Sequence, residues 1–243
     1  AGGKYCSELC ASDDDCGTAA AVYTGESLHL IDLEQGSAIM PSATYIDKQL
    51  QTETGREAIE QYIADNTGRT VELVPEVIGE ASLAISSSGS GSRQAPEMLT
   101  KKIYGQPLLD SGLQGRLFRG TKRLLGNKDI RRLMVFEHPF RLVALITPIL
   151  LRIRSALIDY VGEVDAACVG HPVNFEGRDQ YRNTLAFSRL GEAYRYAGIK
   201  SHRFYPEPIA AAVSFLHGNR EAVGDHVMTV DFGGGTLDFC ILR

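Results

Sequence analysis

The sequence lacks a long uninterrupted hydrophobic run. Its longest apolar stretch, Leu142–Leu151, contains Pro148 and is followed by Arg152 and Arg154. A membrane-spanning helix needs about 20 consecutive apolar residues, so we expect a buried helix here and no membrane partner. No secretory signal is visible at the N-terminus, which begins at Ala1.

A lysine-rich arm is also missing. The 25 Lys and Arg residues are outnumbered by 30 Asp and Glu residues, which gives a net charge of −5. Proteins that bind nucleic acid usually carry clustered positive charge, so no nucleic-acid partner is expected. The content of 44% hydrophobic and 23% charged residues is typical of a soluble globular protein.

The cysteines do not form a pattern typical of a zinc site or a disulfide framework. Their number, five, is odd, and Cys6, Cys10 and Cys16 cluster without a matching pair or a histidine nearby. Cys168 and Cys240 lie in apolar runs, where reduced and buried thiols are usual. The pattern favours a cytoplasmic location.

Two common nucleotide-binding motifs are absent around the glycines of Val227–Leu242. A P-loop would place a lysine after them, and a dinucleotide fingerprint would open a helix there. Instead, Val227–Val230 predicts a buried strand and Thr236–Leu242 predicts a second one. Any phosphate bound here would therefore be held by a hairpin.

The chemistry of this hairpin suits a phosphate. Glycines expose backbone N–H groups that cradle phosphate oxygens, while Asp231 would hold Mg²⁺ and Thr236 would contact a phosphate oxygen. The alternative is a hairpin that uses glycine only at its bend. Asp15, Gly17 and Thr18 repeat the same chemistry near the N-terminus. The two turns together suggest that two lobes clamp one nucleotide.

The rest of the sequence predicts alternating strands and helices, especially in the second half. The strongest helix is Arg141–Tyr160, which carries an apolar stripe at helical spacing. Ser86–Ser92 is a low-complexity segment and predicts a surface loop. Further predictions are strands at Ala19–Tyr23, Leu28–Leu33, Met40–Ile46, Val71–Val74, Val164–Gly170 and Ser201–Tyr205, helices at Glu57–Asn66, Tyr181–Ala197 and Ile209–Leu216, and a turn into a helix at Val77–Leu83.

Two further charged residues are candidates for the same site. Lys122 belongs to the basic segment Gly115–Asn127, and it lies either on a solvated helix face or in a cleft facing a γ-phosphate. Glu207 stands at a predicted helix start, either as a simple helix-start carboxylate or as a group that orients water or Mg²⁺. The residues alone leave both alternatives open.

Taken in order, LFRGTKRLLG, VGHPVNF, YPEPIAAAVSF and VDFGGGTLDFCIL resemble the signatures of one nucleotide-binding domain. The domain that these motifs resemble is the nucleotide-binding domain of the DnaK-type heat-shock chaperones, which belongs to the superfamily of actin, hexokinase and sugar kinases. DDDCGT occupies the position of its first phosphate loop. The resemblance covers most of Asp15–Arg243, is looser over Gln51–Gln114, and is nearest to short, divergent bacterial members.

The resemblance implies an α/β fold: an actin-like (ribonuclease H-like) ATPase lobe with a mixed five-stranded sheet and flanking helices. It places a first lobe at residues 1–217, a peripheral inserted subdomain at about 39–138, and the start of a truncated second lobe at 218–243. The chain is thus expected to be a fragment. Its approach to Asp15 is not apolar, so the first strand is expected to be atypical or missing.

The resemblance also implies ATP and Mg²⁺ as cofactors. Pro172 would couple nucleotide state to a partner domain, with Arg178 and Arg182 as candidates for the arginine that accompanies it. Catalytic roles fall on Lys122, Glu207, Asp231 and Thr236, nucleotide contacts on Asp15, Gly17, Thr18, Gly233, Gly234, Gly235 and Thr236, and Mg²⁺ ligation on Asp15, Asp231 and Glu207.

The implied function is ATP binding and hydrolysis in a chaperone-like protein, with lobe closure coupled to client or co-chaperone proteins. We expect turnover in the full-length protein and none in this segment alone. Two alternatives remain: a degenerate nucleotide-sensing module without turnover, and a small-molecule kinase of the same superfamily.

Overall fold

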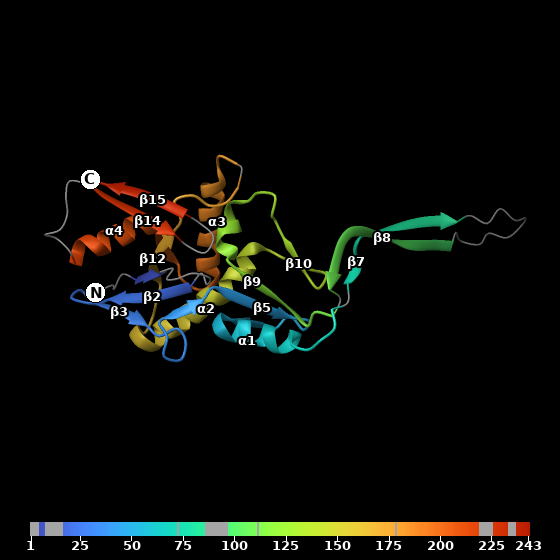
Figure 1. Cartoon of the computed structure of the whole chain (residues 1–243), viewed down its shortest axis with the longest axis horizontal. Helices are drawn as coiled ribbons and strands as arrows, with labels where there is room; N and C mark the ends of the chain where they lie inside the picture. Colours follow the sequence, from blue (N-terminus) through green and yellow to red (C-terminus); the bar gives the residue numbers. More distant parts are fainter. Residues whose placement is uncertain are drawn as a thin grey trace, which may run out of the picture. The chain divides into compact units, whose positions relative to one another are not determined.

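The computed structural model describes residues 5–7, 17–71, 73–85, 97–110, 112–177, 179–218, 226–232 and 237–243. They form a mixed α/β structure (Figure 1). The chain divides into two compact units, the first made of Ala1–Ala64 with Gly115–Arg243 and the second of Asp65–Gln114. The second unit falls within the range predicted for the inserted subdomain.

The described residues begin with a run of strands, and strands alternate with helices later in the chain. The strands are β1 (Tyr5–Ser7), β2 (Gly17–Tyr23), β3 (Leu28–Ile31), β4 (Ile39–Pro41), β5 (Ala43–Asp47), β6 (Thr52–Thr54), β7 (Leu73–Ile85), β8 (Glu97–Asp110), β9 (Gly115–Arg119), β10 (Leu133–Val135), β11 (His138–Phe140), β12 (Ala166–His171), β13 (Ser201–Pro206), β14 (Val227–Phe232) and β15 (Leu237–Leu242). The helices are α1 (Gly55–Asn66), the 3-10 helix η1 (Thr121–Gly126), α2 (Leu142–Val161), α3 (Arg182–Tyr196) and α4 (Glu207–Gly218).

The main sheet of the first unit is mixed, as expected, but it has six strands instead of five. Its order is β13-β12-β1-β2-β3, and β4 pairs in addition with β2. β1, β12 and β13 run parallel to one another. β2 runs antiparallel to both of its neighbours, β1 and β3. The sixth strand arises because β2 is long: Gly17–Ala19 pairs with β4, and Ala20–Tyr23 pairs with β3.

The first strand is present, although it is short. β1 lies between β12 and β2, where Cys6 is in register with Cys168 on one side and with Ala21 on the other. Both neighbours are bound through backbone groups, which explains how a sequence that is not apolar occupies a central position. The strands predicted at Ala19–Tyr23 and Leu28–Leu33 are confirmed, since they correspond to β2 and β3, which pair with each other as a hairpin.

Helix α2 contributes more buried residues to the main hydrophobic core than any other described element. None of the described helices is long and apolar enough to cross a membrane, and α2 is instead buried against α3, η1, β3, β5 and β6. Thr44 of β5 is buried and donates to the carbonyl of Leu145 at 2.8 Å. The predicted apolar stripe is confirmed by the buried residues of α2, which are Leu142, Val143, Leu145, Ile146, Ile149, Leu150, Ile153 and Leu157.

A three-stranded sheet, β6-β5-β9, lies beside α1 (Figure 1). Its small core contains Tyr45 and Ala58, with Tyr62 and Leu117 packed against them. Gly115 is required opposite Tyr45, because a Cβ atom at this position would lie 1.9 Å from the tyrosine ring. The predicted helix at Glu57–Asn66 is confirmed as α1, which begins two residues earlier.

The second unit is a long antiparallel hairpin of β7 and β8. The helix start predicted over Val77–Leu83 is wrong, because this segment continues β7. Its alternation of small apolar and polar residues suits a strand once β8 provides a partner. At the base of the hairpin, Arg69 forms an ion pair with Asp110. The predicted loop Ser86–Ser92 lies outside the described residues.

The end of η1 touches the loop between β12 and α3 backbone to backbone. A Cβ atom on Gly126 would lie 2.6 Å from the carbonyl oxygen of Glu176, and one on Gly177 would lie 2.8 Å from the carbonyl oxygen of Gly126. The amide of Glu176 donates to the carbonyl of Arg123 at 3.2 Å. The glycine of the RLLG motif is therefore needed for close packing.

Replacing Gly126 with Ala should lower the free energy of unfolding by about 1–3 kcal/mol, the usual cost of overpacking. Gly191→Ala is the matched control. There the near atom belongs to the ring of His202 and not to backbone, and alanine gains helix propensity. Urea unfolding monitored by circular dichroism measures both. Equal stability of the two variants would contradict the backbone contact.

His202 of β13 is half-buried between aromatic rings. Its ring centroid lies 5.0 Å from that of Phe204 and 5.7 Å from that of Tyr194. Within the described part of the chain, its buried Nδ1 has no hydrogen-bond partner. Desolvation, followed by the charge of Arg195, lowers the pKa of His202 below its usual 6.5.

The neutral form of His202 should therefore stabilise the fold. A pKa that is lower in the folded than in the unfolded chain gives stability that is complete above pH 6.5 and is lost as the pH falls through the folded pKa. We expect His202→Phe to lose less stability between pH 7 and pH 5 than the unchanged chain. Urea unfolding at both pH values tests this, and parallel losses would refute it.

Candidate functional site

The structure brings together two of the predicted site residues, although 85 positions separate them in the chain. Nζ of Lys122 donates to Oε1 of Glu207 at 2.7 Å. The same ammonium donates to the carbonyl oxygen of Gly170 at 3.1 Å. Three elements therefore meet at one point: η1, the end of β12 and the start of α4.

Lys122 is held by the short helix η1. Gly120 precedes this helix with a φ of 61°, a conformation that glycine adopts without steric cost. Thr121 and Leu125 are buried and fix the helix against the core. Lys122 is thus not on a solvated helix face, since its side chain is only 23% exposed.

Glu207 is positioned by the parallel pair β12 and β13. His171 and Pro206 are in register at the ends of these strands, so Gly170 and Glu207 emerge at the same edge of the sheet. Crevices at the carboxyl ends of parallel strands are where α/β sheets usually bind ligands. Glu207 is also the first residue of α4, where the helix dipole favours a negative charge.

The ion pair is partly shielded from water, because the side chains of Lys122 and Glu207 are 23% and 19% exposed. In this position each charge compensates the other. A phosphate oxygen arriving at this edge would compete with Glu207 for the ammonium of Lys122. The arrangement provides one cation for a phosphate and one carboxylate for a water molecule or a metal ion.

His171 is a buried residue beside this site that the sequence reasoning did not single out. Its Nδ1 donates to the carbonyl of Pro172 at 2.7 Å, and its ring meets that of Phe187 edge to face at 4.8 Å between centroids. The ring also stacks with that of Phe175. In the sequence, this residue could have been found only as a histidine that directly follows the apolar run Val164–Gly170.

The loop after Pro172 is anchored by side chains from α3. Asn183 Oδ1 accepts from the amide of Phe175 at 3.0 Å, and Nη2 of Arg182 donates to Oδ1 of Asn174 at 3.2 Å. Arg182 therefore contacts the loop that follows Pro172. Arg178, the other candidate, lies outside the described residues.

The first predicted phosphate loop is described only in part. Gly17 and Thr18 begin β2 and are buried, while Asp15 lies outside the described residues. The hydroxyls of Thr18 and Ser42 are hydrogen-bonded at 2.6 Å. Thr18 thus already has a hydroxyl partner, Ser42, which the sequence reasoning missed.

The second predicted phosphate loop joins β14 and β15, whose pairing confirms the hairpin. Asp231 lies near the end of β14 in register with Asp238. Only the backbone of Asp231 is described. Residues 233–236, which include the three glycines and Thr236, lie outside the described part. Helix α4, which begins with Glu207, packs against both strands (Figure 1).

The predicted Mg²⁺ ligands are Asp15, Asp231 and Glu207, of which only Glu207 has a described side chain. In the described part of the chain, no three acidic, histidine or cysteine residues cluster as metal ligands. Carboxylate oxygens suit Mg²⁺, which keeps several waters and takes one or two protein carboxylates. The partly exposed carboxylate of Glu207 fits that requirement.

Comparisons with known proteins point to one family. The family model described as Hsp70 protein matches residues 126–243. Heat shock 70 kDa protein BIP3 of Oryza sativa subsp. japonica is 28% identical over 232 residues, which are 94% of this chain and 30% of that protein.

Two mammalian relatives match a shorter part. Heat shock 70 kDa protein 13 is 35% identical in Homo sapiens and 34% identical in Bos taurus over 96 residues, 39% of this chain and 18% of each protein. The chain thus spans 30% or less of the length of these relatives. The family model covers just under half of this chain, and together with these relatives it supports an Hsp70-type family member.

Proposed function

We propose that this chain contributes the ATP-binding and ATP-hydrolysing site of an Hsp70-type chaperone. The observation that carries the proposal is the contact of Lys122 with Glu207 at the carboxyl ends of β12 and β13. Both residues were assigned to the site from separate motifs of the sequence. Their proximity is what a single γ-phosphate site would require.

The main sheet supports an actin-like, ribonuclease H-like fold. Three antiparallel strands, β1 to β3, are followed by two parallel strands, β12 and β13, on the other side of β1. We assign this sheet to a first lobe at residues 1–217, with the peripheral subdomain at about 39–138. Residues 218–243 would begin the second lobe.

In this proposal the charge of each residue determines its role in ATP hydrolysis. Mg²⁺, when bound, neutralises phosphate charge. Lys122 would place its ammonium at the γ-phosphate and stabilise charge that develops during transfer. Glu207 would accept a hydrogen bond from the attacking water or hold the Mg²⁺ shell, together with Asp15 and Asp231. The two glycine turns would bind the phosphates.

Nucleotide state would be passed on through the loop at Pro172. This loop follows β12, whose Gly170 contacts Lys122, and it is tied to α3 through Asn183. A shift of Lys122 from Glu207 to a phosphate would therefore act next to the loop. Client or co-chaperone proteins are the proposed partners, and the cytoplasmic location stays a prediction.

Lys122→Ala should lower the ATP turnover number by about 100-fold or more, the usual effect of removing one group that stabilises transition-state charge. The assay uses the complete natural polypeptide that carries this sequence. Lys128→Ala is the matched control, because Lys128 forms an ion pair of similar length, 2.8 Å, with Asp179. Its turnover should stay within about twofold, as for other exposed ion pairs.

The same experiment separates the alternative functions. Unchanged turnover in Lys122→Ala would overturn the assignment of the cleft lysine. Binding of Mg·ATP by the unchanged protein without release of phosphate would favour a nucleotide-sensing module. Transfer of phosphate to an added sugar would instead indicate a small-molecule kinase.

A further inference from the structure

A positively charged site lies on the same unit, away from the ion pair of Lys122 and Glu207. It is a cavity of about 330 Å³ at the N-terminus of α2. Four arginines line it from three separate segments of the chain: the stretch after η1, the start of α2 and the middle of α3. These arginines are Arg131, Arg132, Arg141 and Arg189.

This concentration of positive charge contrasts with the chain as a whole, whose net charge is −5. Glu192 compensates one of the four, since its carboxylate accepts from both Nη atoms of Arg141 at 2.8 and 2.6 Å. Arg131 and Arg132 are exposed, and no carboxylate in the described part of the chain forms an ion pair with either. The cavity therefore carries a surplus of positive charge.

Arg189, which lines the cavity, is held in place by hydrogen bonds to backbone carbonyl groups. Its guanidinium donates to the carbonyl oxygens of Leu125, Asn127 and Ile130 at 2.9, 2.9 and 3.0 Å. Desolvation, followed by the charges of Arg141 and Arg131, lowers the pKa of Arg189. An anion in the cavity would relieve the repulsion among these like charges.

The start of α2 adds to the attraction. Arg141 is the N-cap residue without a side-chain hydrogen bond to the helix, and the first turn contains no acidic residue. Leu142 and Val143 of this turn line the cavity. The positive end of the helix dipole thus has no negative side chain in its own first turn and favours an anion at this point.

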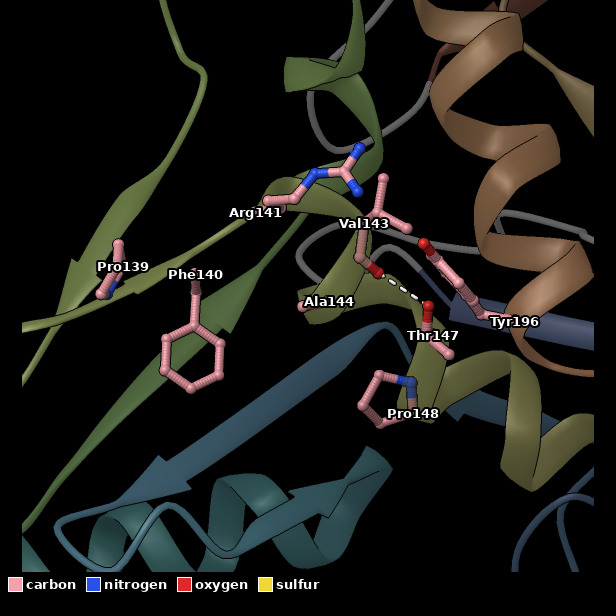
Figure 2. A pocket seen from close by; sticks show the side chains of 8 residues that line it. All are labelled: Pro139, Phe140, Arg141, Val143, Ala144, Thr147, Pro148 and Tyr196. Atoms are coloured by element: carbon pink, nitrogen blue, oxygen red, sulfur yellow. Dashed lines mark hydrogen bonds between the residues drawn. The ribbon is translucent and has the colours of Figure 1, made fainter.

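An apolar groove continues from the arginine cavity. Its volume is about 510 Å³, and it shares Arg141 and Val143 with the cavity. Figure 2 shows Phe140 and Pro148 on the groove, with Ala144 and Tyr196 nearby. A ligand with an anionic group in the cavity would extend an attached carbon skeleton along this groove.

We propose that the cavity and the groove together bind a small phosphate monoester with an apolar carbon skeleton. Several guanidinium groups match a dianionic phosphate better than a single carboxylate, because each arginine offers a fork of N–H donors. The two volumes lie within or near the range of small-molecule sites. The site shares no residue with the Lys122–Glu207 contact.

Phenyl phosphate and inorganic phosphate are suitable probes, and calorimetry on the 243-residue chain measures their affinities. Phenyl phosphate should bind saturably and about fivefold or more tightly than inorganic phosphate, because its ring buries apolar surface in the groove. The double variant Arg131→Gln/Arg132→Gln should weaken binding of both probes by about tenfold, since two surface charges are lost.

The matched control is Lys200→Gln/Arg203→Gln, which removes two exposed positive charges away from the cavity. Its affinities should stay within about twofold of those of the unchanged chain, because only distant, screened charges are removed. Equal weakening in both double variants, or no saturable binding to the unchanged chain, would overturn the site.

Ala144→Leu tests the groove separately. Ala144 is exposed on α2 and lines the groove, so a larger side chain should fill it without disturbing the core. This variant should lose the preference for phenyl phosphate and keep its affinity for inorganic phosphate. An undiminished preference would show that the carbon skeleton does not occupy the groove.

Discussion

Burial of the apolar face of α2 is the constraint on which the rest of the larger unit depends. The helix packs against α3 and η1 as well as strands of both neighbouring sheets, and eight of its residues are buried. Full burial of a large aliphatic side chain contributes about 1.5–3 kcal/mol. Because α2 contacts β3 earlier in the chain and α3 later in it, its burial fixes where η1 and α3 lie beside the main sheet.

The Lys122–Glu207 contact is a consequence of this packing. The parallel register of β12 and β13 brings the start of α4 to the edge where Lys122, near the start of η1, contacts Gly170. The position of η1 itself depends on the backbone contact between Gly126 and Gly177. Arg189 binds the other side of the same segment through carbonyl oxygens. The Lys122–Glu207 ion pair and the arginine cavity therefore both depend on the position of η1.

Much of the fold of the larger unit follows from sequence pattern. The apolar spacing of α2, the helix α3 and the hairpin of β14 and β15 were all predictable, because local spacing decides which face of an element is buried. Pattern failed for β7 and for β1. Both are strands that form because a distant segment supplies backbone partners, and single-segment periodicity contains no information about such a partner.

By itself, the sequence determined which residues are chemically suited to bind phosphate and in which order they occur along the chain. It left open whether Lys122 was solvated and whether Glu207 was only a helix-start carboxylate. The tertiary structure decided both, since strand register and helix packing set distances between residues far apart in sequence. The arginine cavity was decided only there as well: its four arginines come from three segments whose proximity depends on the burial of α2.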